Sequence, residues 1–253
     1  MATSTARGRA AMNEPQRAIA VVPAAGSGQR MGSDAPDGVP KQYAPLAGAT
    51  VLDHTLQVLL DSPCIASVIV GIHPEDSHWQ ASRYAGHSRV QTVHGGAERC
   101  DTVQRCLAHL LQSGVAEMRW VLVHDAARPC LRAAAIQRLW WQLQHSEVGG
   151  LLARPVSDTI KRASAENCVS ETLERSGLWA AQTPQMFRLK ALADALERAR
   201  RDHRAVTDEA AAMEYSNACP QLIEGDSDNI KITHPGDLSL AEQILRAQGR
   251  RCA

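Results

Sequence analysis

Short apolar runs alternate along the chain with longer stretches typical of helices. Strands are predicted at residues 19–22, 67–72, 90–93, 120–123, 148–153 and 221–224. Helices are predicted at residues 51–60, 99–112, 133–145, 189–201, 207–215 and 235–248. Strands alternating with helices indicate βαβ units, and runs without in-and-out alternation indicate strands covered on both faces. The predicted fold class is therefore α/β, a Rossmann-like, mostly parallel twisted sheet flanked by helices.

The segment 155–181 breaks this alternation. Residues 157–162 and 172–175 flank a polar turn at 163–168, a pattern that predicts a β-hairpin. An isolated two-stranded hairpin is only marginally stable in water, so we expect this arm to pack on something, and a second protomer is a candidate. The expected organisation is a flexible tail at 1–17 and a single domain at 18–250 that carries the arm.

Ligands of open α/β sheets bind beyond the carboxyl ends of strands, so the loop after the first run is the first candidate site. That run stops at Pro23 and is followed by A-A-G-S-G and then Arg30. A loop of small residues leaves its backbone N–H groups free to point at an anion. It is not a dinucleotide fingerprint, because Met31 stands where the third glycine would be, and it is not a P-loop. Taken alone, it fits a phosphate-binding loop and a plain strand-to-helix turn equally well.

Two further strand-end loops favour a ligand site. Residues 94–102 read H-G-G-A-E-R-C-D-T and lead into a helix, and residues 124–129 read H-D-A-A-R-P. Three such loops on one edge of the sheet predict a nucleotide pocket. His94 and His124 also sit at strand ends, and we interpret both as structural hydrogen-bonding residues.

Composition narrows the function classes. Lys plus Arg and Asp plus Glu both number 27, so the formal net charge is zero, which argues against a nucleic-acid or membrane-surface binder. Seven cysteines without a C-x-x-C suggest neither a disulfide framework nor a zinc site, and reduced thiols indicate a cytoplasmic protein. No apolar run reaches the roughly 18 residues that span a bilayer, and residues 1–17 lack the apolar core of a signal peptide.

A nucleoside triphosphate in such a pocket would need backbone N–H groups, cations and Mg²⁺. Arg30 and Lys41 are the candidate cations, and Lys231 fits as a third. Asp125 could accept from a ribose hydroxyl or help to hold Mg²⁺. If a phosphate monoester attacks the α-phosphorus, the nucleophile is already anionic and no general base is needed. Catalysis would then consist of positioning and of stabilising the transition-state charge.

A series of motifs gives a more specific identification. They are V-V-P-A-A-G-S-G-Q-R-M at 21–31, P-K-Q-Y at 40–43, G-G-A-E-R at 95–99, V-L-V-H-D-A-A-R-P-C at 121–130, P-V-S-D-T-I-K-R at 155–162, T-P-Q at 183–185, V-T-D-E-A at 206–210 and E-G-D-S-D-N-I-K-I-T at 224–233. In this order the chain resembles the 2-C-methyl-D-erythritol 4-phosphate cytidylyltransferase family of non-mevalonate isoprenoid synthesis, over about residues 18–247.

The resemblance implies a Mg²⁺-dependent nucleotidyltransferase of the nucleotide-diphospho-sugar transferase fold. It would transfer CMP from CTP to methylerythritol phosphate and form a homodimer through the 155–181 arm. The catalytic residues that it implies are Arg30, Lys41 and Lys231. The implied nucleotide site comprises Pro23, Ala24, Ala25, Gly26, Gly28, Gly95, Gly96, Thr102, Asp125 and Ala126, with Asp125 as the metal ligand. The implied substrate site comprises Arg128, Thr159, Arg175, Thr183, Thr207 and Lys231, with Thr159 and Arg175 reaching the partner protomer's substrate.

Two positions depart from the family pattern. Ala97 stands where the family usually has Asp, which removes one polar contact near the nucleoside, and Thr102 replaces the usual Ser but keeps the hydroxyl. Two other functions fit parts of the pattern. A pentitol-phosphate cytidylyltransferase, acting for example on ribitol 5-phosphate, shares the nucleotide motifs. A non-catalytic nucleotide-binding module shares the fold, but it would not need every cation at the reacting phosphates.

Overall fold

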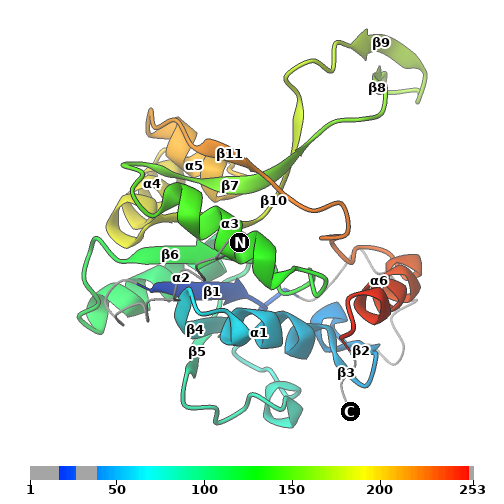
Figure 1. Ribbon diagram of the computed structural model, residues 1–253. Coiled ribbons are helices and arrows are strands. Elements are labelled where there is room, and N and C mark those ends of the chain that lie inside the picture. The colour runs from blue at the N-terminus through cyan, green and yellow to red at the C-terminus, as the bar shows by residue number, and fades with distance from the viewer. Residues whose placement is uncertain (1–16, 27–38, 251–253) are drawn as a thin grey trace, which may run out of the picture.

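The computed structural model describes residues 17–26 and 39–250. The predicted tail, apart from Arg17, and the predicted site residues Gly28 and Arg30 lie outside these ranges. Within them, a seven-stranded sheet forms the centre of the molecule in the order β11-β7-β10-β6-β1-β4-β5 (Figure 1). Its strands are β1 (Ala18–Pro23), β4 (Ile65–Ile72), β5 (Val90–His94), β6 (Trp120–Val123), β7 (Gly149–Pro155), β10 (Trp179–Arg188) and β11 (Gln221–Glu224).

All neighbouring strands of the sheet run parallel except β10, which is antiparallel to both β6 and β7. The mostly parallel sheet is therefore confirmed. Each strand predicted from an apolar run is present, with ends shifted by no more than a few residues.

Helices cover both faces of the sheet, as the unbroken apolar runs predicted. Helices α1 (Val51–Asp61) and α3 (Ala133–Leu143) pack on one face, and α2 (Arg99–Gln112), α4 (Leu189–Arg201) and α5 (Glu209–Tyr215) on the other (Figure 1). Successive side chains of a strand point to opposite faces. Accordingly, Ala20 and Val22 join the first hydrophobic cluster, whereas Ile19 and Val21 join the second. Helix α6 (Gly236–Ala247) packs through Ala241 and Leu245 in a third, smaller cluster.

Strand β10 was not predicted from the sequence. It contains Pro184, which has no N–H to donate to a neighbouring strand, and polar residues interrupt its apolar pattern. The fold accommodates this interruption because the register of β10 against β7 shifts between Ala181 and Gln185. Four short elements were also not predicted: the 3-10 helices η4 (Lys41–Tyr43) and η5 (Trp79–Ala81) and the strands β2 (Pro45–Leu46) and β3 (Ala49–Thr50).

The predicted hairpin is present and projects from the sheet (Figure 1). Strands β8 (Ile160–Ala163) and β9 (Val169–Leu173) pair antiparallel at its tip. Most of its residues are exposed, including Val169 at 65%. The arm leaves the sheet from the end of β7 and returns at the start of β10, where Pro155 and Trp179 are paired. None of the helices in residues 17–26 and 39–250 is long and apolar enough to cross a membrane.

Candidate functional site

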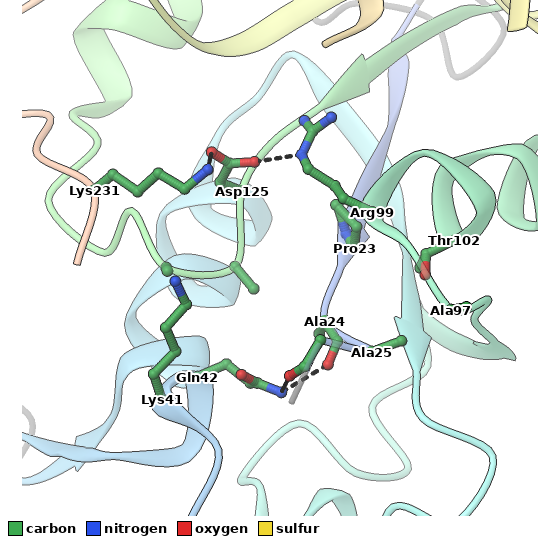
Figure 2. A pocket seen from close by; sticks show the side chains of 13 residues that line it. Pro23, Ala24, Ala25, Lys41, Gln42, Ala97, Arg99, Thr102, Asp125 and Lys231 are labelled. Carbon is green, nitrogen blue, oxygen red and sulfur yellow. Dashed lines mark hydrogen bonds and ion pairs between the residues drawn. The ribbon is translucent and has the colours of Figure 1, made fainter. Parts of the chain in front are cut away.

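A pocket of about 330 Å³ opens where β1 and β6 end, the edge at which open α/β sheets bind ligands (Figure 2). Its walls come from the three strand-end loops singled out in the sequence, from η4 and from the segment before α6. The described residues that line it are Pro23, Ala24, Ala25, Gly26, Lys41, Gln42, Ala97, Arg99, Thr102, Asp125, Ala126, Ala127 and Lys231.

Most of the site residues predicted within the described chain therefore line one pocket. Gly95 and Gly96 lie directly behind it. A Cβ atom on Gly95 would stand 2.4 Å from that of Ala25, and the N–H of Gly96 donates to Thr102 Oγ1 at 3.0 Å. Arg128 contacts Asp125 through its Nε, and the hydroxyl of Thr183 accepts from the Asp125 N–H. Glycine at position 95 is thus needed for the close approach of two pocket loops.

Three predicted substrate residues do not reach this pocket within one chain. Thr159 and Arg175 are exposed on the arm, and Arg175 donates to the carbonyl oxygen of Ser157. Thr207 is exposed just before α5, where Gln185 of β10 fixes the loop by donating to Asp208 Oδ2 at 2.9 Å.

The turn η4 connects Lys41 to the loop after β1. The side-chain amide of Gln42, which is 5% exposed, donates to the carbonyl oxygens of Ala24 (2.8 Å) and Gly26 (3.1 Å). Tyr43 donates its hydroxyl to Asp76 at 2.8 Å. Lys41 itself donates to the carbonyl oxygen of Ile232 at 3.2 Å, so its ammonium group lies beside the segment that carries Lys231 (Figure 2). The sequence indicated Lys41 as a site residue, but it did not predict the two hydrogen bonds by which Gln42 clamps the loop after β1.

Asp125 is the centre of an ion cluster at the back of the pocket. Its Oδ1 contacts Arg99 Nε at 2.8 Å, and its Oδ2 contacts Lys231 Nζ at 2.9 Å and Arg128 Nε at 3.4 Å. Burial alone would raise the pKa of Asp125, but the three cations outweigh burial and hold that pKa far below its usual range. The carboxylate is therefore ionised at every physiological pH.

Arg99 was not predicted as a site residue, although it lines the pocket. Its Nη1 and Nη2 donate to the two carboxylate oxygens of Glu209 at 2.7 and 3.0 Å, and Glu209 is 1% exposed. Burial would lower the pKa of Arg99, but Glu209 and Asp125 reverse that effect and raise it. The sequence did carry one signal. Arg99 is the first residue of α2, where the helix dipole disfavours a cation, so nearby carboxylates were to be expected.

His124 is a buried structural residue, as expected from its place at a strand end. Its Nε2 lies 3.1 Å from the carbonyl oxygen of Arg128, which can only accept, so Nε2 carries the proton. Nδ1 is then the acceptor for the Thr183 hydroxyl at 2.9 Å, and that hydroxyl oxygen accepts from Asp125 N–H at 3.1 Å. Burial lowers the pKa of His124 to about 4. The neutral ring thus fixes both the Thr183 hydroxyl and the backbone of Asp125.

The state of His124 gives a pH dependence of stability. Because its folded pKa lies below the value of about 6.5 for an exposed histidine, the unfolded chain binds the additional proton first on acidification. We expect the free energy of unfolding to fall from pH 7 towards pH 4, with about 2 kcal/mol lost from this residue by pH 5. Urea titrations at pH 7 and pH 5 measure this difference in the free energy of unfolding. His124→Asn, which keeps a donor and an acceptor, should lose this dependence, whereas the exposed His145→Asn should retain it.

The segment that carries Lys231 is held against the loop after β6 and against β10. Asn229 donates to the carbonyl oxygen of Thr183 at 2.8 Å, and Arg128 donates to that of Asn229 at 2.8 Å. The N–H of Ile232 donates to the carbonyl oxygen of Ala127 at 2.8 Å. Lys231 is thereby presented opposite the loop after β1 and beside Lys41 (Figure 2). Two ammonium groups beside a small-residue loop suit a polyanionic ligand.

Among the described residues, no group of three His, Cys, Asp or Glu could hold a metal ion on its own. Asp125 is the one carboxylate among the described lining residues. A metal ion here would therefore depend on ligand oxygens in addition to Asp125.

Comparison with solved structures defines the class of protein. A 4-diphosphocytidyl-2C-methyl-D-erythritol synthase is similar with a TM-score of 0.79 and 37% identity, over 90% of this chain and 98% of that one. The Francisella tularensis 2-C-methyl-D-erythritol 4-phosphate cytidylyltransferase has a TM-score of 0.78 and 35% identity, over 90% and 100% of the two chains. The fold and its strand-end pocket are those of a nucleotidyltransferase.

Sequence comparison gives the family. Residues 18–247 match the model of the 2-C-methyl-D-erythritol 4-phosphate cytidylyltransferase family. Proteins of that name from Pseudomonas putida (strain GB-1) and Photorhabdus laumondii are 48% and 46% identical. These similarities cover 92% and 90% of this chain and 96% and 94% of the relatives. The chain belongs to the 2-C-methyl-D-erythritol 4-phosphate cytidylyltransferase family.

Proposed function

We propose that this protein transfers the CMP group of CTP to 2-C-methyl-D-erythritol 4-phosphate, giving the CDP-alcohol and pyrophosphate for isoprenoid precursor synthesis. The match to the family over residues 18–247 carries this proposal. The pocket supports it, because a loop of small residues and two lysines converge where a triphosphate would lie. A pentitol-phosphate cytidylyltransferase is not favoured, since the matched family and relatives carry the methylerythritol name.

The chemistry requires few groups from the protein. An oxygen of the substrate phosphate forms a bond to the α-phosphorus of CTP, and the bond from that phosphorus to the oxygen bridging to the β-phosphate breaks. Pyrophosphate leaves with the electron pair. Because the nucleophile is already an anion, no proton has to be removed. Rate enhancement then depends on holding the reactants in line and on neutralising the negative charge of the transition state.

The cations divide this work in our proposal. Lys41 and Lys231 face the phosphates from one side, and Arg30, which lies outside the described residues, is proposed to act on them from the loop after β1. The backbone of residues 23–26 would wrap the nucleotide, with Gly95, Gly96 and Thr102 towards the cytosine. Asp125 and Ala126 would face the ribose.

Among the described lining residues, the carboxylate of Asp125 is the group that suits Mg²⁺. Oδ1 of Asp125 accepts from Arg99 alone and keeps a lone pair, and Mg²⁺ commonly binds one or two carboxylates together with substrate phosphates. We propose that Asp125 and the triphosphate would hold the ion together. When bound, Mg²⁺ would neutralise charge on the transferring phosphate.

The sugar-phosphate site is proposed around Arg128, Thr183 and Thr207. The hydroxyl of Thr183 already donates to His124 and accepts from Asp125 N–H, so it has one lone pair left. It can therefore accept from a hydroxyl of the substrate but cannot donate to its phosphate. That donation would come from Arg128 and Lys231.

An assay separates the candidate functions. The protein is incubated with CTP, Mg²⁺ and either methylerythritol 4-phosphate or ribitol 5-phosphate, and pyrophosphate release is followed. We expect release with the first substrate and little with the second. Faster release with ribitol 5-phosphate would favour the pentitol-phosphate enzyme. Nucleotide binding without release from either would favour a non-catalytic module.

We further propose a homodimer in which the arm of one protomer completes the site of the other through Thr159 and Arg175. Both residues are exposed, and the arm that carries them projects from the sheet, which supports this (Figure 1). A cytoplasmic location and a lack of nucleic-acid or membrane partners stay predictions from the sequence.

Subunit mixing tests the shared site. Arg175→Ala and Lys41→Ala proteins should each be impaired, whereas their mixture should regain activity. In a heterodimer, the Arg175→Ala pocket receives an intact arm, so random exchange restores about a quarter of all sites. Measuring pyrophosphate release before and after mixing tests this. If exchange is verified and activity stays at the mean of the two variants, each site is built within one chain.

A further inference from the structure

The two oxygens of the Asp125 carboxylate have different surroundings. Oδ1 is occupied by Arg99, whose Nε lies 2.8 Å away. Oδ2 faces Lys231 and Arg128, at the side where Lys231 enters the pocket (Figure 2). Asp125 is only 6% exposed, so a shift in either contact would turn the carboxylate inside a confined space. Its orientation is therefore set by the contacts of both oxygens, and Arg99 is the cation that holds Oδ1.

Arg99 is itself fixed from a second element. Glu209, on α5, accepts from both terminal nitrogens of Arg99, while the third nitrogen donates to Asp125. All three nitrogens of the guanidinium thus donate to carboxylates. The planar fork of arginine suits this double engagement, which the single ammonium group of lysine cannot reproduce. Glu209 also balances the charge of Arg99.

We propose that Arg99 is a positioning residue that, held by Glu209, fixes the plane of the Asp125 carboxylate so that it faces the ribose hydroxyls of the nucleotide. Arg99 lines the pocket, but each of its nitrogens already donates to a carboxylate, so we assign it to positioning and not to phosphate binding. This rests on the proposed function, because it assigns a partner to a residue of the proposed nucleotide site. It also gives a role to the buried acid of the V-T-D-E-A motif, which the proposed chemistry does not use.

Equilibrium binding of nucleotides tests this inference without the transfer reaction. The dissociation constants of CTP, 2′-deoxy-CTP and 3′-deoxy-CTP are measured in the absence of the second substrate. The wild-type protein should prefer CTP over at least one deoxy analogue. Arg99→Lys should reduce that preference about tenfold, because Asp125 turns towards its remaining cations and the hydroxyl loses its acceptor. Glu209→Gln should change the preference in the same direction by a smaller factor.

The readout distinguishes positioning from a merely structural role. A structural role would weaken all three nucleotides equally and leave their ratio unchanged, and that result in a folded Arg99→Lys protein would overturn the proposal. If Arg99→Lys does not fold, Glu209→Gln decides by the same ratio. Arg200→Lys, which changes the exposed pair with Glu197 on α4, is the matched control and should leave the ratio at the wild-type value. Wild-type protein that binds no CTP would contradict the proposed function instead.

Discussion

Replacement of Lys41 by alanine is expected to lower kcat by a factor equivalent to on the order of 2–4 kcal/mol, with a smaller change in the KM for CTP. The turn η4 holds this side chain in place through Gln42 and Tyr43, and the ammonium group faces the pocket beside Lys231. A cation held in advance at the site of developing charge stabilises the transition state more than the ground state. Steady-state kinetics of pyrophosphate release with both substrates varied measures the effect.

The control for this experiment is Lys190→Ala. The side chain of Lys190 on α4 is 43% exposed and pairs with Asp194, away from the pocket, so its loss should leave kcat unchanged. Lys41→Arg keeps the charge on a longer, planar group and should recover only part of the rate. If Lys41→Ala keeps the wild-type kcat, Lys41 has no role in the transition state. A rise in KM alone would limit its role to binding.

Replacement of Arg99 by methionine is expected to lower the free energy of unfolding by about 3–5 kcal/mol. Arg99 is the hydrogen-bond partner of both oxygens of Glu209, which is 1% exposed, so the variant leaves a buried carboxylate without its cation. Asp125 also loses one of its three cations. Urea unfolding at pH 7, followed by circular dichroism, measures the change.

A second substitution shows whether the unpaired carboxylate is the cause. The double variant Arg99→Met, Glu209→Met replaces the pair with apolar side chains, and exchanges of this kind are often close to neutral in stability. It should therefore recover most of the loss, while its nucleotide selectivity stays impaired. A single variant that costs less than about 1 kcal/mol, or a double variant no more stable than the single one, contradicts this account.

The sheet and its pocket edge could largely be predicted from the sequence, because burial on both faces leaves a clear trace. Strands such as β1 and β6 are continuous apolar runs, and each ends in a change to small or polar residues. Parallel strands bring those ends to one edge, so the residues that follow them lie together. That reasoning predicts the loops that carry Ala24 and Asp125, whereas the role of Thr102 is implied only by the resemblance to the family.

What the sequence did not reveal depends on pairings between distant residues. Arg99 and Glu209 are 110 positions apart, and neither charge by itself distinguishes a buried pair from two solvated side chains. The Gln42 clamp likewise depends on backbone carbonyls whose direction follows from the fold. Strand β10 was hidden because Pro184 and its polar neighbours interrupt the apolar pattern, although the sheet tolerates them through a shift in register.

The position of the arm between strands β7 and β10 has a consequence for how proteins of this fold can diverge in sequence. Strands β7 and β10 are antiparallel neighbours, and the whole arm is the tip of the hairpin that they form. Insertions or deletions beyond Pro155 and Trp179 therefore change neither the strand order nor the register of the segment near Thr183. The arm is therefore a module whose length and sequence can change in evolution while the strands around the pocket keep their arrangement.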